Sequence, residues 1–266
     1  MGEHRSVDIG AGILMPMLGF GTWDISHNDT YAAVRTALDA GYRHIDTAYG
    51  YHNEDEIGRA VEDSGVPRED IFITTKIPSR RVGQENETVA NSLGGLRTDY
   101  VDLWLIHDPP AGQKSVDLWE FFIGLRETGR ARAIGVSNYL TPQIDAIVQA
   151  TGVKPTVNQI KWSPQLFDPV RLRENEDRGI RLEGFSAIRL TDLNDPTLVP
   201  IAQAHGVTTA QVLLRWQIEH GVVAIPRSIT PGRIRENIDI WDFALDADEV
   251  ERIDAMSTVA PASSGS

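Results

Sequence analysis

The sequence predicts an α/β protein of the (β/α)8 TIM-barrel class, with an N-terminal β-hairpin that closes the floor of the barrel. Eight short apolar or β-branched runs alternate with amphipathic segments along almost the whole chain. Strands that are separated by helices pair in parallel through right-handed crossovers. Eight such units in 266 residues fit a closed barrel better than an open sheet.

The expected strands are short and end in polar or small residues. They are Leu18–Gly21, Arg43–Thr47, Ile71–Lys76, Val101–His107, Ala131–Ser137, Thr156–Gln159, Arg181–Phe185 and Val222–Ile225. The expected helices are amphipathic segments between and after these strands. They are Asp29–Ala40, Glu54–Ser64, Glu85–Leu96, Ser115–Thr128, Pro142–Ala150, Pro169–Arg178, Thr208–His220 and Pro231–Ile240. The segment Val7–Met17, which turns at Gly10 and Gly12, is expected to form the floor hairpin.

The alternative architecture is an open, doubly wound sheet, which normally carries G-x-G-x-x-G after its first strand. Here the first strand runs into Gly19-Phe20-Gly21-Thr22-Trp23-Asp24, and the third glycine is absent. The chain also lacks a linker rich in proline, glycine and serine that would separate two domains. We therefore expect one barrel domain over residues 1–258 and a flexible C-terminal tail over residues 259–266.

The composition narrows the possible partners. A formal net charge of −13 argues against nucleic acid or an anionic membrane surface, because both require a basic face. The chain has no cysteine, and its seven histidines are not paired on one face, so no metal site is expected. With no apolar run of roughly 20 residues and no apolar leader, we expect a cytoplasmic protein, a monomer that acts on a small molecule.

Four polar residues lie at or just after successive strand ends, where barrel enzymes carry their chemistry. These residues are Asp46, Tyr51, Lys76 and His107. Hydride addition to a carbonyl carbon gathers negative charge on the oxygen, which needs a proton donor. A lysine ammonium beside Tyr51 favours the phenolate and lowers a phenol pKa that is ordinarily about 10. The group therefore predicts carbonyl reduction, with Tyr51 as the acid and His107 orienting the substrate oxygen.

Taken singly, most of these residues have a simpler structural explanation. Asp46 can be a turn or cap residue, Tyr51 a half-buried loop aromatic, and His107 a histidine at the edge of the core. Lys76 is the exception, because an isolated ammonium in a buried strand is costly. Their succession at strand ends is what indicates catalysis.

The same segments resemble the aldo-keto reductase family along nearly the whole chain. His44–Glu54 resembles the family's aspartate–tyrosine signature, Phe72–Lys76 its lysine strand and Asp102–His107 its histidine strand. Further resemblances lie at Gly135–Asn138 and Val157–Gln159, which match its carboxamide-binding positions, and at Ile225–Asn237, which matches its cofactor-clamping segment. Within the family, the resemblance implies a bacterial reductase of the 2,5-diketogluconate or methylglyoxal kind.

The resemblance implies NADPH/NADP+ as cofactor, extended across the barrel mouth without a Rossmann fold. Ser137, Asn138 and Gln159 would hold the nicotinamide amide. Arg227 and Arg233 would grip the 2′-phosphate, since planar guanidinium groups suit a phosphate, and this favours NADPH over NADH. The full set of implied cofactor contacts is Gly21, Thr22, Asp46, Ser137, Asn138, Gln159, Phe185, Ser186, Ile188, Arg227, Ser228, Ile229, Arg233, Glu236 and Asn237.

The resemblance also implies a substrate pocket, and the chain departs from the family there. The implied contacts are Trp23, Tyr51, Pro78, His107 and Asp108. Pro78 and Asp108 stand where the family commonly has tryptophan, and Gly50 stands where a larger apolar residue is frequent. We therefore expect an open, polar site for small or hydrophilic carbonyl compounds.

The expected function is NADPH-dependent reduction of a small aldehyde, ketone, α-dicarbonyl compound or keto-sugar to an alcohol. A second hypothesis is a barrel that binds NADPH and reports redox state without significant turnover. A third is a phosphate-binding isomerase or lyase that uses Lys76 as a Schiff-base or general-base residue.

Overall fold

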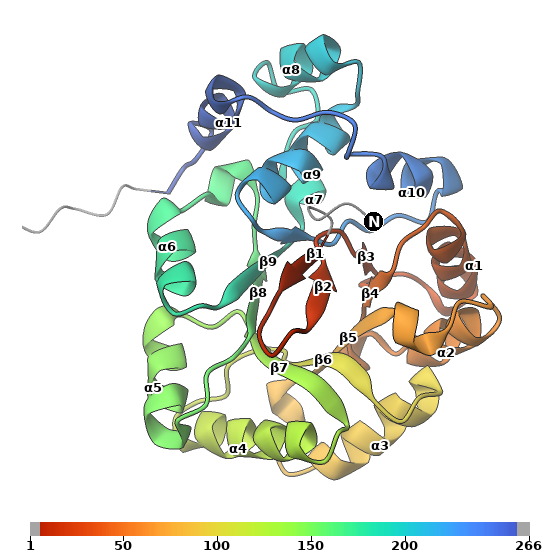
Figure 1. The fold of residues 1–266 in the computed structure, drawn as a ribbon, viewed down its shortest axis with the longest axis vertical. Helices are drawn as coiled ribbons and strands as arrows, with labels where there is room; N and C mark the ends of the chain where they lie inside the picture. Colours follow the sequence, from red (N-terminus) through yellow and green to blue (C-terminus); the bar gives the residue numbers. More distant parts are fainter. Residues whose placement is uncertain (1–5, 260–266) are drawn as a thin grey trace, which may run out of the picture.

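Eight parallel strands form one sheet whose neighbours follow chain order from β3 to β10 (Figure 1). The computed structural model describes residues 6–259. The strands are β3 (Phe20–Gly21), β4 (His44–Asp46), β5 (Phe72–Ile77), β6 (Val101–Ile106), β7 (Ala131–Ser137), β8 (Val157–Lys161), β9 (Arg181–Phe185) and β10 (Val223–Ala224). Each one overlaps an expected strand, and the predicted barrel class is confirmed.

The barrel closes where the first and last strands meet. Leu18 forms a parallel bridge with Ala224. The Gly19 amide donates to the Ala224 carbonyl at 2.8 Å, and the Ala224 amide donates to the Met17 carbonyl at 2.9 Å. These bonds satisfy backbone groups that an open sheet would leave at its edges.

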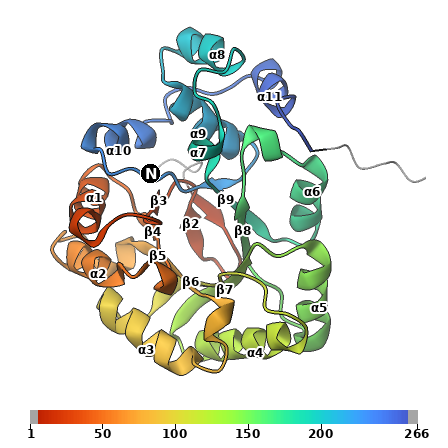
Figure 2. The same cartoon turned by 180° about the vertical axis from the view of Figure 1, so that it is seen from behind.

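Helices surround the strands on the outside (Figure 2). They are α1 (His27–Asp39), α2 (Glu54–Glu62), α3 (Glu85–Leu96), α4 (Gln113–Glu127), α5 (Thr141–Thr151), α6 (Pro169–Asp177), α7 (Ala187–Leu190), α8 (Leu198–His205), α9 (Thr209–Glu219), α10 (Pro231–Ile238) and α11 (Ala247–Asp254). The eight expected helices are present, with ends that differ by at most two residues, whereas α7, α8 and α11 were not expected. No helix within residues 6–259 is long and apolar enough to cross a membrane.

The expected floor hairpin is present as β1 (Ser6–Asp8) paired antiparallel with β2 (Leu14–Pro16). It lies across the middle of the ring of strands in Figure 1. Met15 of the hairpin is fully buried and packs with Phe72, Leu103 and Leu105, which point into the barrel. Apolar side chains thus fill this end of the barrel, and polar chemistry is left to the other end.

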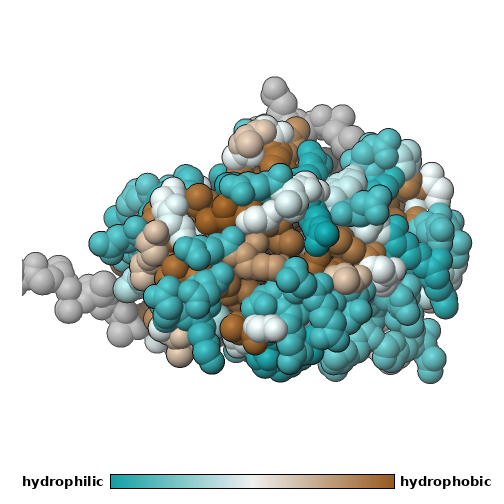
Figure 3. All heavy atoms as spheres, turned by 90° about the horizontal axis from the view of Figure 1, so that it is seen from below, coloured by the Kyte–Doolittle hydropathy of each residue, from teal (hydrophilic) through white to brown (hydrophobic). Residues whose placement is uncertain are grey.

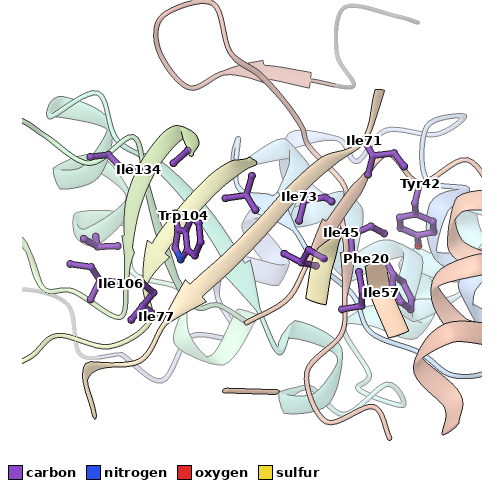
Figure 4. Close-up of a cluster of buried hydrophobic side chains, with 14 of the residues drawn as sticks. Phe20, Tyr42, Ile45, Ile57, Ile71, Ile73, Ile77, Trp104, Ile106 and Ile134 are labelled. Carbon is purple, nitrogen blue, oxygen red and sulfur yellow. The ribbon is translucent and has the colours of Figure 1, made fainter. Parts of the chain in front are cut away.

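Alternation along the strands decides which residues reach the barrel interior. On β5, Ile73 and Ile77 belong to the large core between strands and helices, so Lys76 points inward because side chains alternate. Figure 4 shows this outer core, with Ile73, Ile77, Trp104 and Ile106 on neighbouring strands. The same alternation on β6 turns His107 inward, because Trp104 and Ile106 face the helices.

The helices carry hydrophilic residues on the faces that they turn to solvent. Figure 3 shows one side of the molecule, where hydrophilic residues cover most of the surface and hydrophobic residues show between them. This is the pattern of amphipathic helices that bury one face against a sheet.

Gly58 allows α2 to pack closely on the end of α3. A Cβ added at Gly58 would lie 2.2 Å from the Gly95 carbonyl oxygen, and a backbone atom cannot move aside easily. We expect Gly58→Ala to lower the free energy of unfolding by about 1–3 kcal/mol, as overpacked sites do. Urea unfolding followed by circular dichroism measures this change.

Gly124→Ala in α4 is the matched control, because a Cβ there would meet nothing within 4 Å. Alanine has the higher helix propensity, so this variant should gain about 0.5–1 kcal/mol. Equal losses in both variants would show that close helix packing is not the cause.

Candidate active site

A cleft of about 340 Å³ opens at the carboxyl ends of the strands, away from the floor hairpin. Most of the residues expected to bind substrate or cofactor line it. These are Gly21, Trp23, Asp46, Tyr51, His107, Ser137, Asn138, Gln159, Phe185, Ser186, Ile188 and Arg227. The fold therefore brings together residues from segments that are far apart in the sequence.

Lys76 lies fully buried beneath the cleft and is paired with Asp46. Its Nζ is 2.7 and 2.8 Å from the two carboxylate oxygens of Asp46 and 2.8 Å from the Thr47 carbonyl oxygen. A buried ammonium is tolerated only with such partners. Burial alone would lower the pKa of Lys76, but Asp46 and Tyr51 raise it above its ordinary value. The lysine is therefore charged at neutral pH.

Tyr51 ends the 3₁₀ turn η2 (Tyr49–Tyr51), which follows β4. Its hydroxyl oxygen is 3.4 Å from the Lys76 Nζ, and its ring meets the His107 ring edge-on at 5.6 Å between centroids. His52 closes the turn with φ of 59°, which carries the chain directly into α2. This short turn places the phenol between the ammonium and the imidazole.

The structure corrects one expectation about Tyr51. Burial raises the pKa of its phenol above the ordinary value, and Asp46 adds to the rise, while Lys76 opposes it. Lysine thus acts in the expected direction, but burial outweighs it. The phenol keeps its proton at neutral pH, which is the state that a proton donor must have before the reaction.

His107 faces the cleft as a neutral ring. Burial, with the positive charge of Lys76 nearby, lowers the pKa of its imidazole to about 4. Its Nδ1 is buried without a hydrogen-bond partner in residues 6–259. A neutral imidazole carries one N–H donor and one acceptor nitrogen, so it can donate to a carbonyl oxygen without adding a charge.

Ser137, Asn138 and Gln159 meet where β7 and β8 end. The Asn138 side-chain amide donates to the Ser137 hydroxyl at 3.0 Å, and its backbone amide donates to the Gln159 carbonyl at 2.8 Å. Asn138 has φ of 62°, a conformation that asparagine tolerates better than most residues. Ser137, Asn138 and Gln159 form a polar part of the cleft wall. Their hydroxyl and amide groups are suited to bind an amide ligand.

Trp23 forms part of the mouth and is flanked by two arginines. The guanidinium carbons of Arg189 and Arg227 lie 5.2 and 6.0 Å from its ring centroid. Arg227 also donates to the Asp24 carbonyl oxygen at 2.8 Å and pairs with the Asp24 carboxylate at 3.2 Å. The sequence did not single out Arg189, although it also lines the cleft.

Several expected cofactor residues do not line this cleft. Within the part of the chain that the structure describes, its wall does not include Thr22, Ser228, Ile229, Arg233, Glu236 or Asn237. Thr22 is fully buried, and its hydroxyl donates to the Asp46 carbonyl oxygen at 2.9 Å, which supports the backbone under the site. Arg233 is exposed in the first turn of α10, on the segment that follows Arg227.

Two expected substrate residues lie beside the cleft and not in its wall. Pro78 is buried at the start of the loop after β5. The Asp108 carboxylate accepts from the Ser79 amide at 3.2 Å and from the Ser79 hydroxyl. A side chain at Gly50 would meet the Arg80 guanidinium, with 3.1 Å between an added Cβ and Nη2. Asp108 and Arg80 lie close enough to His107 to affect the pKa of its imidazole, but neither of them lines the cleft.

Glu183 is a buried group at the site that the sequence analysis missed. It lies on β9, two residues before Phe185, and accepts a hydrogen bond from the Gln159 side-chain amide at 2.8 Å. The signal was a carboxylate inside the strand-like run Arg181–Phe185, on the same strand face as Phe185.

The sequence of the chain is similar to the sequences of known reductases. The sequence profile of the Aldo/keto reductase family matches residues 17–258. Methylglyoxal reductase DkgA of Escherichia coli is 37% identical over 257 residues, which are 95% of this chain and 94% of that protein. The 2,5-diketo-D-gluconic acid reductase B of a Corynebacterium species is 40% identical over 244 residues, which are 90% of this chain and 88% of that protein.

Solved structures show the same fold. An aldo/keto reductase from Brucella melitensis has a TM-score of 0.90 and 43% identity, covering 94% of this chain and 98% of its own. A Bombyx mori aldo-keto reductase in complex with NADP has a TM-score of 0.89 and 31% identity, covering 95% of this chain and 92% of its own.

Proposed function

Because the chain belongs to the aldo/keto reductase family and is an NADP-dependent oxidoreductase, we propose that it reduces small, hydrophilic carbonyl compounds to alcohols, with Tyr51 as the proton donor. The substrates in view are small aldehydes, ketones, α-dicarbonyl compounds and keto-sugars. The observation that carries the proposal is the buried Asp46–Lys76 pair beneath a phenol that is still protonated and faces the cleft.

The chemistry of the cleft wall suits NADPH. Ser137, Asn138 and Gln159 offer hydroxyl and amide groups to a carboxamide, and Phe185 offers a flat apolar surface to a ring. Arg227 and, further along the chain, Arg233 offer cations to phosphate groups. When bound, NADPH supplies the hydride that adds to the carbonyl carbon.

The residues of the chain then have separate tasks. Tyr51 gives its proton to the carbonyl oxygen as negative charge develops there. The Lys76 ammonium stabilises the phenolate that remains, and Asp46 holds that ammonium in place. The neutral His107 donates a hydrogen bond that orients the carbonyl oxygen. Because the pair, the phenol and the imidazole are prearranged, little reorganisation is needed during the reaction.

The names of two relatives suggest where to look for substrates, since one is a methylglyoxal reductase and another a 2,5-diketo-D-gluconic acid reductase. Both are polar dicarbonyl compounds. Arg80 and Asp108, two charged groups close to His107, support a preference of this kind.

A substrate panel tests the proposal. The protein is mixed with NADPH and small aldehydes, α-dicarbonyl compounds or keto-sugars, and loss of the reduced nicotinamide absorbance is followed. Turnover of at least one polar carbonyl compound is expected. Tight NADPH binding with no turnover of any compound would favour the redox-sensing alternative. Borohydride trapping of a substrate on Lys76 without nicotinamide would favour the isomerase or lyase alternative.

The role proposed for Arg233 predicts a cofactor preference. We expect Arg233→Ala to weaken NADPH binding about tenfold to a hundredfold, because a charge-assisted hydrogen bond to phosphate is lost. NADH lacks the 2′-phosphate, so its affinity should change by less than about threefold. Titration of protein fluorescence with each cofactor measures both values.

Arg235→Ala is the matched control, since Arg235 is an exposed arginine of the same helix two residues later. Two residues turn the side chain to a different helix face. Its removal should leave both affinities within about twofold. Equal losses for NADPH and NADH in Arg233→Ala would remove the phosphate role.

A further inference from the structure

A second buried carboxyl group lies behind the proposed acid and has no task in the mechanism above. Glu183 is fully buried inside the barrel on β9. Its Oε2 accepts from the Gln159 Nε2 at 2.8 Å. Its Oε1 lies 3.6 Å from the His44 Nε2 and has no hydrogen-bond partner within residues 6–259. A buried polar group in such a place needs an explanation.

Glu183 fixes the side chain of Gln159 together with Asp46. The Gln159 Nε2 donates to the Asp46 Oδ2 at 2.7 Å and to the Glu183 Oε2 at 2.8 Å. A primary amide has two N–H donors, and both are used by these two carboxyl groups. The Gln159 oxygen is therefore the group left to accept from a ligand in the cleft, which Gln159 lines.

Two carboxyl groups share one ammonium in this part of the barrel. The titratable groups around Glu183 in the described residues are His44 and Asp46 from β4, Lys76 from β5, and Tyr51. Lys76 binds Asp46 directly, at 2.7 Å. Burial lowers the pKa of His44 to about 3, so its neutral ring cannot balance a second negative charge. Two carboxylates that depend on one cation cannot both ionise cheaply.

The surroundings of Glu183 favour its protonated form. Burial and the Asp46 carboxylate raise the pKa of Glu183 to about 8, against the opposing effects of Gln159 and Lys76. A proton on Oε1, on the side of His44, leaves the hydrogen bond from Gln159 to Oε2 intact. If Glu183 ionises, its negative charge raises the pKa of Tyr51 further, which makes the phenol a weaker proton donor.

We propose that Glu183 is a positioning residue of this reductase: as an uncharged carboxyl group, it locks Gln159 against Asp46 and leaves the Lys76 charge to Asp46 and Tyr51. The inference rests on the proposed function, because it assigns to Gln159 a cofactor contact and to Tyr51 the proton transfer. Ionisation of Glu183 then converts the site to a less active form.

Two variants separate the charge of Glu183 from its hydrogen bond. Glu183→Gln keeps the shape and an acceptor for Gln159, but it cannot ionise. Glu183→Leu has a similar volume and offers no acceptor, so an N–H of Gln159 is left unpaired. The control is Glu54→Gln, which changes a buried carboxyl group that bonds to Thr75 and Ser92 on the outer side of β5.

The expected readout is the pH profile of kcat/KM for carbonyl reduction. In the natural protein and in Glu54→Gln, kcat/KM should fall above about pH 8. In Glu183→Gln it should equal the natural value within about twofold below pH 7 and should not fall near pH 8. In Glu183→Leu it should be about tenfold lower at every pH, with NADPH affinity reduced by a similar factor. An unchanged alkaline fall in Glu183→Gln, or natural NADPH affinity in Glu183→Leu, would overturn the proposal.

A second readout does not depend on turnover. A carboxyl group whose pKa is higher in the folded than in the unfolded protein stabilises the fold least at high pH, because the unfolded chain then releases the proton more easily. The melting temperature of Glu183→Gln should therefore gain on that of the natural protein as the pH rises from about 5 to about 8. A difference that is constant with pH would show that Glu183 is already ionised, and would overturn the proposal even if no substrate were found. Failure of the substrate panel with this pH-dependent gain present would instead count against the proposed reaction alone.

Discussion

Replacing Tyr51 with phenylalanine is expected to lower kcat for carbonyl reduction by roughly 10²–10⁴-fold, the usual contribution of a positioned general acid. Phenylalanine keeps the ring and its edge-on contact with His107, so only the hydroxyl beside Lys76 is lost. NADPH affinity should stay within about twofold, because the hydroxyl is not among the proposed cofactor contacts. Steady-state rates and a fluorescence titration with NADPH measure the two effects.

Tyr49→Phe is the control for this substitution, since Tyr49 lies in the same 3₁₀ turn. Its ring lies 5.2 Å from the Arg81 guanidinium carbon and 6.2 Å from the His52 ring, and it does not line the cleft. The kcat of Tyr49→Phe should differ from the natural value by less than about twofold. Natural activity in Tyr51→Phe would refute the acid assignment, and equal losses in both variants would point to damage to the turn.

The barrel could be predicted from the sequence because one physical rule repeats along it. Each strand must bury one face against helices and the other in the barrel, so apolar runs and amphipathic segments alternate. Helices α7, α8 and α11, which were not expected, are not part of this alternation. Helix α8 is short and contains Pro200 in its first turn, and α7 has four residues. Helix α11 did leave a signal, since Asp246 and Glu249 form a capping box.

The central residues of the candidate site could also be predicted, because the ends of the strands can be recognised in the sequence. Lys76 and His107 close apolar runs, and alternation then points them into the barrel. The sequence does not show how deeply each side chain is buried. The net effect on the Tyr51 pKa depends on how far burial outweighs the Lys76 charge, and that follows from packing in three dimensions. Glu183 was missed because its partner Gln159 lies on the neighbouring strand.

Replacing Lys76 with methionine is expected to have the largest combined effect on stability and activity. Methionine fits an unbranched chain, but it leaves the Asp46 carboxylate buried without its cation. Removing one partner of a buried ion pair typically costs about 3–5 kcal/mol. Because Asp46 must then take up a proton in the folded state, the loss should be larger at about pH 8 than at about pH 5. Urea unfolding at the two pH values measures this.

The double variant Asp46→Asn with Lys76→Met separates folding from chemistry. It removes both charges, and buried pairs replaced by neutral groups of similar volume often lose little stability. We expect it to recover most of the unfolding free energy that Lys76→Met loses, and to lose the extra destabilisation at about pH 8 that the unpaired Asp46 carboxylate causes. Its kcat should remain lower than natural by roughly a thousandfold, because no cation then stabilises the Tyr51 phenolate. Recovery of activity along with stability would show that the pair serves folding alone. No recovery of stability would show that the loss in Lys76→Met comes from packing and not from an unpaired carboxylate, because the double-variant cycle isolates the coupling between the two residues.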